Sequence, residues 1–192
     1  LGTSNSSNSS NNKDITYNGL PGFKNFELLS RDINRVVEQD GLLKLTNLKC
    51  LSLRDNRIVK IDGLLELRNL QSLDLAENLI NKVEGLSSLT NLKKLYLRSN
   101  RIMRLEGFSK LKNLVLLDLV QNKITKIEGL SELKSLVTLD LGGNRICMIE
   151  GLSGLVNLAS LSLESNNFDL EQGLEYLLKI KKAHSAKRLK LR

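Results

Sequence analysis

Acidic and aromatic side chains recur at intervals of 22 residues, each between two leucines. Asp74, Tyr96, Asp118 and Asp140 occupy this position in four successive Leu-x-Leu segments. A carboxylate can pair with a cationic side chain, and a tyrosine offers a large apolar surface with one hydrogen-bonding group. Residues of these types at a regular spacing favour recognition of a partner over chemical catalysis.

The residue sets needed for catalysis or metal binding are absent from the sequence. His184 is the single histidine, and Cys50 and Cys147 lie 147 − 50 = 97 residues apart. Two scattered cysteines and one histidine cannot form a structural zinc site. The sequence also has no P-loop and no dinucleotide fingerprint. We therefore expect a protein that is not an enzyme, with no catalytic residue, cofactor or metal.

The leucines that flank each variable position predict the elements that carry it. In Leu51-Ser52-Leu53 the side chains of a strand alternate, so both leucines point inward and Ser52 points outward. Four leucine columns begin at Leu45, Leu48, Leu51 and Leu53 and continue through six turns to Leu155, Leu158, Leu161 and Leu163. This is the leucine-rich-repeat signature, and such repeats bury their leucines only by stacking.

The repeats predict an α/β fold, a leucine-rich-repeat solenoid shaped as a curved horseshoe. We expect a parallel β-sheet on the concave face, short turns or 3-10 segments on the convex face and a longer helix in the last repeat. The strands should be centred near residues 52, 74, 96, 118, 140 and 162.

Two further columns predict how each coil turns. An asparagine side chain can satisfy backbone groups of its own turn and of a neighbouring coil, so stacked copies should form a ladder. A glycine is expected where the chain needs a positive φ or a close backbone approach. The asparagines are Asn56, Asn78, Asn100, Asn122, Asn144 and Asn166, and the glycines are Gly41, Gly63, Gly85, Gly107, Gly129, Gly151 and Gly173.

Departures from the repeat predict the domain organisation. Residues 1–14 are rich in Asn and Ser and should be disordered, residues 15–44 form an N-terminal cap with a degenerate first repeat, and residues 45–170 carry the repeats. Residues 171–192 form a basic C-terminal repeat or cap with helical spacing from Leu170 to Ala183. Leu189 and Leu191 resemble a further strand, six residues later than the 22-residue period. This pattern ends partway through a repeat, so the native chain is expected to continue.

The charge of the chain is concentrated at one end. Seven basic residues and no acid lie in 179–192, so the remainder carries 8 − 7 = +1. A nearly neutral body argues against nucleic-acid binding, and no apolar run is long enough to cross a membrane. Cysteines on different turns should be thiols, which favours a reducing compartment.

Two charged patterns of the turns fit a solvated surface. Acids at Asp62, Glu84, Glu106, Glu128 and Glu150 follow bases at Lys60, Lys82, Arg104 and Lys126, as an alternating ladder would. A basic edge follows the asparagines at Arg57, Arg101, Lys123 and Arg145, and this edge is either solvated or meets an acidic partner.

The exposed positions of the predicted sheet are the candidate binding site. Aspartate is a poor strand residue, yet it occupies three of the six central positions from Ser52 to Ser162. An aromatic residue ringed by charges is typical of an interface hot spot. Leu116 and Val120 should add exposed apolar area. The partner-binding residues predicted are Asp74, Tyr96, Arg98, Asp118, Asp140, Glu77, Leu116 and Val120.

The segment "LTNLKKLYLRSNRIMRLEGF", residues 89–108, resembles the repeats of the family of protein phosphatase 1 regulatory subunit 7. The resemblance implies a cytoplasmic or nuclear scaffold whose concave face binds the phosphatase catalytic subunit. Asp74, Tyr96 and Asp118 match the acid–aromatic–acid series of that family, which would place an aromatic residue at Asp140. We expect another protein as partner, no nucleic acid, no membrane, and a monomer.

Other function classes stay open from the sequence. A secreted or surface recognition module, such as an adhesin or an immune-type receptor, would fit the Asn-Ser-Ser triplets at Asn5 and Asn8. A nucleic-acid or nuclear-import element would fit the basic stretch "KRLKLR".

Overall fold

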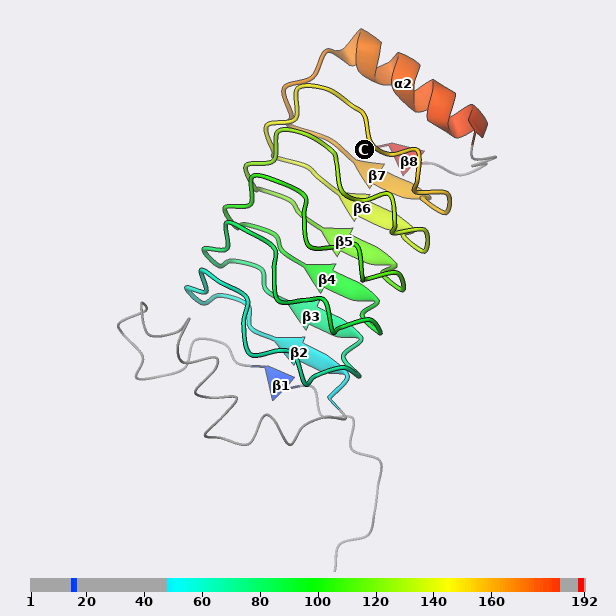
Figure 1. The fold of residues 1–192 in the computed structure, drawn as a ribbon. Helices are drawn as coiled ribbons and strands as arrows, with labels where there is room; N and C mark the ends of the chain where they lie inside the picture. Colours follow the sequence, from blue (N-terminus) through cyan, green and yellow to red (C-terminus); the bar gives the residue numbers. More distant parts are fainter. Residues whose placement is uncertain (1–14, 17–47, 184–189, 192) are drawn as a thin grey trace, which may run out of the picture.

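Residues 15–16, 48–183 and 190–191 are described by the computed structural model, in which short strands stack into one parallel sheet (Figure 1). The sheet follows the order of the sequence, so every strand pairs with the strands of the adjacent coils. The strands are β1 Ile15–Thr16, β2 Cys50–Ser52, β3 Ser72–Asp74, β4 Lys94–Tyr96, β5 Leu116–Asp118, β6 Thr138–Asp140, β7 Ser160–Ser162 and β8 Lys190–Leu191. The predicted parallel solenoid is confirmed, although strands β2 to β7 end at the expected central residues.

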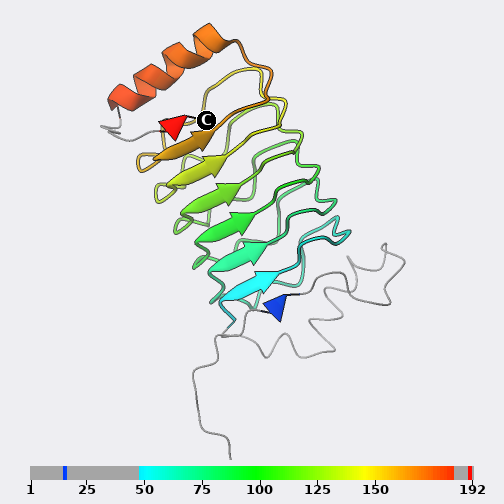
Figure 2. The ribbon, with the colours of Figure 1, turned by 180° about the vertical axis from the view of Figure 1, so that it is seen from behind.

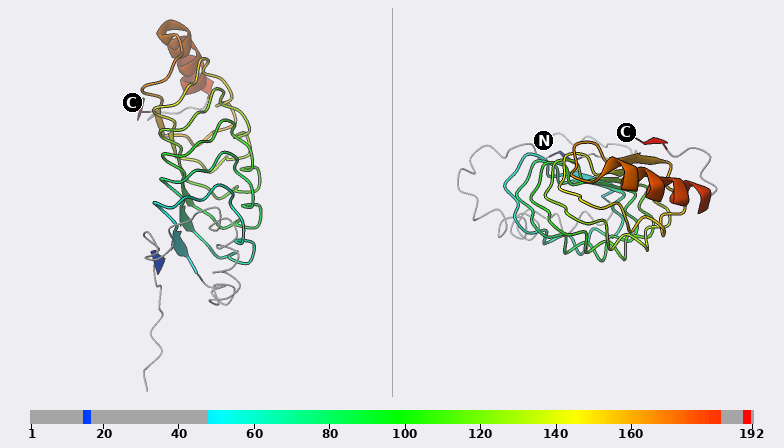
Figure 3. Two further views of the ribbon diagram at one scale, coloured as in Figure 1. Left: turned by 90° about the vertical axis from the view of Figure 1, so that its left-hand side faces the viewer. Right: turned by 90° about the horizontal axis from the view of Figure 1, so that it is seen from above.

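Each coil is a flattened loop with the strand on one side and turns on the other (Figure 3). Both leucines of a Leu-x-Leu segment lie inside this loop. Leu95 and Leu97 are completely buried, and Phe108 fills the core from the opposite side of the coil. The single core therefore runs along the stack, as the alternation of side chains predicts.

Short turns form the convex side, as expected. In one coil the amide of Leu67 donates to the carbonyl of Leu64 at 3.1 Å, and the amide of Leu70 donates to the carbonyl of Leu67 at 3.0 Å. The same two hydrogen bonds recur in the next four coils. These tight turns bury one leucine every three residues while they reverse the chain toward the next strand.

The asparagine ladder is confirmed. The amide of Ile80 donates to Oδ1 of Asn100 at 2.9 Å, while Nδ2 of Asn100 donates to the carbonyls of Leu75 at 2.9 Å and Leu97 at 3.1 Å. Each asparagine therefore joins its own turn to the preceding coil. The equivalent contacts are made by Asn78, Asn122, Asn144 and Asn166.

The last described repeat contains the predicted helix, α2 at Leu170–Ala183, which lies over the end of the stack (Figure 2). Strand β8 then pairs with β7, with Leu191 opposite Leu161. That register places β8 at 191 − 161 = 30 residues, eight beyond the period of 22, so the prediction of six was wrong. Backbone pairing selects the register, and a shift of two residues keeps the same side chains on the same face.

At the other end, Ile15 and Thr16 form β1 and pair with Leu51 and Ser52 of β2. The predicted disordered tail at 1–14 and nearly all of the predicted cap at 15–44 lie outside the described residues.

Candidate protein-binding face

The structure brings the central residues of the repeats together in one row. Strand pairing places Asp74 beside Tyr96, Tyr96 beside Asp118, and Asp118 beside Asp140. All four side chains are half-buried, and the leucines on either side of them point into the core. We call Asp74, Tyr96, Asp118 and Asp140 the central row.

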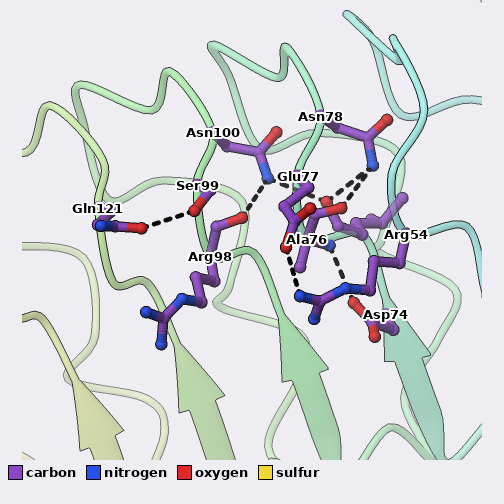
Figure 4. Close-up of polar contacts among 10 residues, drawn as sticks. Arg54, Asp74, Ala76, Glu77, Asn78, Arg98, Ser99, Asn100 and Gln121 are labelled. Carbon is purple, nitrogen blue, oxygen red and sulfur yellow. Dashed lines mark hydrogen bonds and ion pairs between the residues drawn. The ribbon is translucent and has the colours of Figure 1, made fainter.

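Each aspartate of the central row also caps the end of its own strand. Oδ1 accepts the amide of the residue two positions later: Ala76 for Asp74 at 2.9 Å, Val120 for Asp118 at 3.0 Å, and Gly142 for Asp140 at 3.1 Å. Figure 4 shows this contact for Asp74. Each of these aspartates therefore has a structural role as a cap of its strand, whereas the sequence pattern alone indicated only a role in recognition. Within the described residues, Oδ2 of each of these carboxylates accepts no hydrogen bond.

A second feature, missed from the sequence, accompanies the capping aspartates. Two residues after the central residue of each strand, the chain has a small buried residue if the central residue is an aspartate. It has a long exposed residue if the central residue is Ser52, Tyr96 or Ser162. The buried residues are Ala76, Val120 and Gly142, and the exposed ones are Arg54, Arg98 and Glu164. The pattern Asp-x-small, visible in the sequence, is the signal that could have indicated the caps.

The prediction that Val120 contributes exposed apolar area is wrong. Its exposed fraction is 9%. Both backbone polar groups of Val120 are hydrogen-bonded: its amide donates to Asp118, and its carbonyl accepts the amide of Ser99 of the preceding coil at 2.8 Å. Leu116, also predicted, is half-buried beside Lys94 and Thr138 and remains on the face.

Glu77 and Arg98 lie at the carboxyl ends of the strands rather than on the strands themselves (Figure 4). Glu77 has a left-handed backbone with φ 57 and forms an ion pair with Arg54 of the preceding coil. Arg98 is exposed and forms no ion pair with any described residue. Beside it, Ser99 donates to Oε1 of Gln121 at 2.8 Å. The face therefore has an acidic centre with one unpaired guanidinium at its edge.

The environment raises the pKa of Asp118 above its usual value. Burial is the largest cause, and the charges of Asp140 and Asp74 act in the same direction. The hydrogen bond from Val120 and the charge of Arg98 lower the pKa and offset part of the rise. Ionised Asp118 is therefore held beside a like charge, which a cation from a partner would relieve.

Other kinds of site are not indicated in the described residues. No group of three or more His, Cys, Asp or Glu side chains there could hold a metal ion, and no helix there is long and apolar enough to cross a membrane. Cys50 and Cys147 are not joined by a disulfide, as predicted.

Comparisons with known proteins agree with this architecture. Residues 46–88 match the family model described as leucine rich repeats in two copies, and residues 90–146 match another for the leucine rich repeat. A comparison with curated protein sequences gives no match. No finding links the chain to regulatory subunit 7 of protein phosphatase 1, so that resemblance stays a prediction.

Several solved structures share the fold. An internalin (inlF) from Listeria monocytogenes is 28% identical with a TM-score of 0.66, over 77% of this chain and 42% of the internalin. A leucine-rich-repeat protein of Leptospira interrogans is 27% identical with a TM-score of 0.57, over 79% and 44%. TLR13, solved in a complex with ssRNA13, is 31% identical with a TM-score of 0.63, over 73% and 21%. The chain thus spans less than half of each of these three structures.

Both the repeat signature and the stacked parallel strands agree with these matches. Leucine-rich-repeat proteins are typically non-enzymatic scaffolds that bind other proteins. Residues 46–88 and 90–146 of this chain belong to the leucine-rich-repeat family.

Proposed function

We propose that the chain is a non-enzymatic scaffold that binds another protein through the concave face of its sheet, with contacts centred on the central row. The observation that supports this most directly is the pairing of Asp74, Tyr96, Asp118 and Asp140 on four adjacent strands. Each carboxylate uses one oxygen in its cap and leaves the other for a cation. An aromatic side chain between such acids is typical of an interface hot spot.

The proposed partner carries a basic segment that lies across the central row. The row crosses four adjacent strands and is about 14 Å long, enough for two or three basic side chains of an extended segment. Arg98 at the edge would in turn meet an acid of the partner, and Leu116 would contribute apolar contact. The first partner to test is the catalytic subunit of protein phosphatase 1, with the chain acting as a monomer in the cytoplasm or nucleus.

The TLR13 structure contains a single-stranded RNA, so RNA is the other class of ligand to consider for this face. Single-stranded nucleic acid is usually held by cations along its backbone and by aromatic residues that stack on its bases. The central row offers one aromatic residue and three acids, and those acids repel phosphate. The charge of the face therefore favours a basic protein segment.

Replacing Tyr96 with alanine should weaken binding of the true partner by about 2 kcal/mol or more, because Tyr96 is the aromatic residue of the row and lies between two acids, Asp74 and Asp118. Binding to purified phosphatase catalytic subunit can be measured by titration calorimetry. Glu106→Ala, which removes an exposed acid on the far side of the turn, is the control and should change the affinity very little. If Glu106→Ala weakens binding and Tyr96→Ala does not, the concave face is not the site. If wild type does not bind, the phosphatase is not the partner.

Replacing Asp118 with asparagine should weaken partner binding about five- to tenfold without destabilising the fold, because asparagine keeps the oxygen that caps Val120.

The same variant tests the raised pKa of Asp118. Because this pKa is higher in the folded state than in the unfolded state, protonation of Asp118 stabilises the fold at acidic pH. That stabilisation is lost as pH rises from the usual pKa through the raised pKa. The variant should therefore melt at an equal or higher temperature than wild type at neutral pH. That advantage should disappear at acidic pH, where Asp118 is protonated. A variant that melts well below wild type at neutral pH would contradict this interpretation.

A further inference from the structure

Five cations form a strip on three successive coils, in the part of each coil that follows the asparagine. Arg101, Lys123 and Arg145 occupy one column, and their amides donate to the carbonyls of Ile80, Ile102 and Ile124 of the preceding coils at 2.8 to 2.9 Å. Arg104 and Lys126 lie three residues further along the first two of these coils. Lys123 is half-buried and the other four are exposed. We call Arg101, Arg104, Lys123, Lys126 and Arg145 the basic strip.

The basic strip differs from the lysines of the earlier coils because its cations are not neutralised. Lys60 and Lys82, at the positions equivalent to Arg104 and Lys126, both approach Glu84, at 3.8 and 3.4 Å. No residue of the basic strip forms an ion pair or a side-chain hydrogen bond with any described residue. Glu106 and Glu128 follow Arg104 and Lys126 by two residues, yet neither is within ion-pair distance. The alternating ladder predicted from the sequence is thus paired in the early coils and open in the later ones.

Exposed methionines accompany these cations. Met103 adjoins Arg104 in the chain, and Met148 occupies on the next coil the position that Arg104 and Lys126 hold on theirs. Methionine is flexible and polarisable, and it is common on surfaces that adapt to apolar side chains. The strip therefore combines unpaired positive charge with apolar contacts at both ends.

We propose that the basic strip is a second binding surface, which takes an acidic segment of a partner protein in which Asp or Glu alternates with apolar residues. Coils stack at the strand spacing of about 4.8 Å, so the three-coil column spans about 10 Å. An extended peptide covers that length in about three residues, so a short acidic run reaches all three coils. Its carboxylates meet the cations, and its apolar side chains meet Met103 and Met148.

A protein segment fits the strip better than single-stranded nucleic acid does. Base stacking needs aromatic side chains next to the cations. Phe108, the aromatic residue of this part of the chain, is completely buried. The strip is also opposite in charge to the central row, so the two surfaces select different segments and can be tested separately.

The test is the affinity of a fluorescently labelled peptide of alternating Glu and Leu, measured by anisotropy at about 0.05 and 0.15 M salt. We expect wild type to bind and its affinity to fall with salt. The variant R101Q/K123Q/R145Q should bind about tenfold more weakly. The matched control is K60Q/K82Q/K112Q, which removes the same number of charges at lysines that are already ion-paired, and it should bind within about twofold of wild type.

Several outcomes would overturn the proposal. Equal losses in the two triple variants would mean attraction by net charge alone. Loss of peptide binding in Tyr96→Ala would place the peptide on the central row instead. Tighter binding of a labelled single-stranded RNA than of the peptide, with the same dependence on the strip residues, would make the strip a nucleic-acid site. No binding of the peptide by wild type at the lower salt would also rule the proposal out. Circular dichroism of each variant confirms that the fold is intact.

Discussion

Replacing Gly107 with alanine is expected to destabilise the solenoid by about 3 kcal/mol or more. Gly107 has φ 82, in the left-handed region that a side chain disfavours. A Cβ at this position would also lie 2.1 Å from the carbonyl oxygen of Val83, which is backbone and cannot rotate away. The substitution must therefore push two neighbouring coils apart, and that loss of contact extends into the shared core. Equilibrium unfolding in urea measures the change.

The matched control for Gly107 is Gly142→Ala. Gly142 is buried but has no positive φ, and its added Cβ would meet the Cγ of Glu164 at 3.1 Å, in a side chain that can move. This variant should lose about 1 kcal/mol or less. If both variants unfold at the same urea concentration, the close approach of Gly107 to Val83 does not limit the stacking of coils.

Replacing Asn100 with leucine should cost about 3 kcal/mol of unfolding free energy. The substitution keeps the approximate size of the side chain but leaves the amide of Ile80 and the carbonyls of Leu75 and Leu97 without their asparagine partner. Asn100 is only 7% exposed, so water cannot readily replace these hydrogen bonds. Urea unfolding of wild type and variant provides the comparison.

An exposed asparagine provides the control for Asn100→Leu, because it also joins two coils but does not belong to the ladder. Asn91 donates to the carbonyl of Arg68 at 3.0 Å, also across two coils, but it lies on the surface where water can substitute. Asn91→Leu should cost about 0.5 kcal/mol. An unfolding midpoint for Asn100→Leu that matches wild type would remove the ladder as a source of stability.

Much of the fold was predictable because the same pattern of residues recurs in every repeat. Leu-x-Leu segments imply a strand with one buried face, and recurrence every 22 residues implies stacking in parallel. The role of the asparagine also followed, since a short amide side chain after a strand has few other uses. The helix at Leu170–Ala183 was visible as a change from period two to helical spacing.

The central row was predictable in its membership but not in its chemistry. Placing Asp74, Tyr96 and Asp118 side by side required only the repeat period and the outward direction of the residue between two leucines. The capping role of the aspartates, and the burial of Val120 that accompanies it, depend on hydrogen bonds within and between coils. The residue types in the exposed columns do not specify these hydrogen bonds.

The sequence by itself determined the repeat, the direction of the strands, the buried leucines and the row of residues that can meet a partner, because these follow from periodicity and side-chain alternation. The tertiary structure alone decided the register of β8 and the ion pairing of the turns. Lys82 reaches Glu84, whereas the equivalent Arg104 and Glu106 remain apart. Such differences depend on distances of a few ångströms between flexible side chains, which residue types and spacing do not specify.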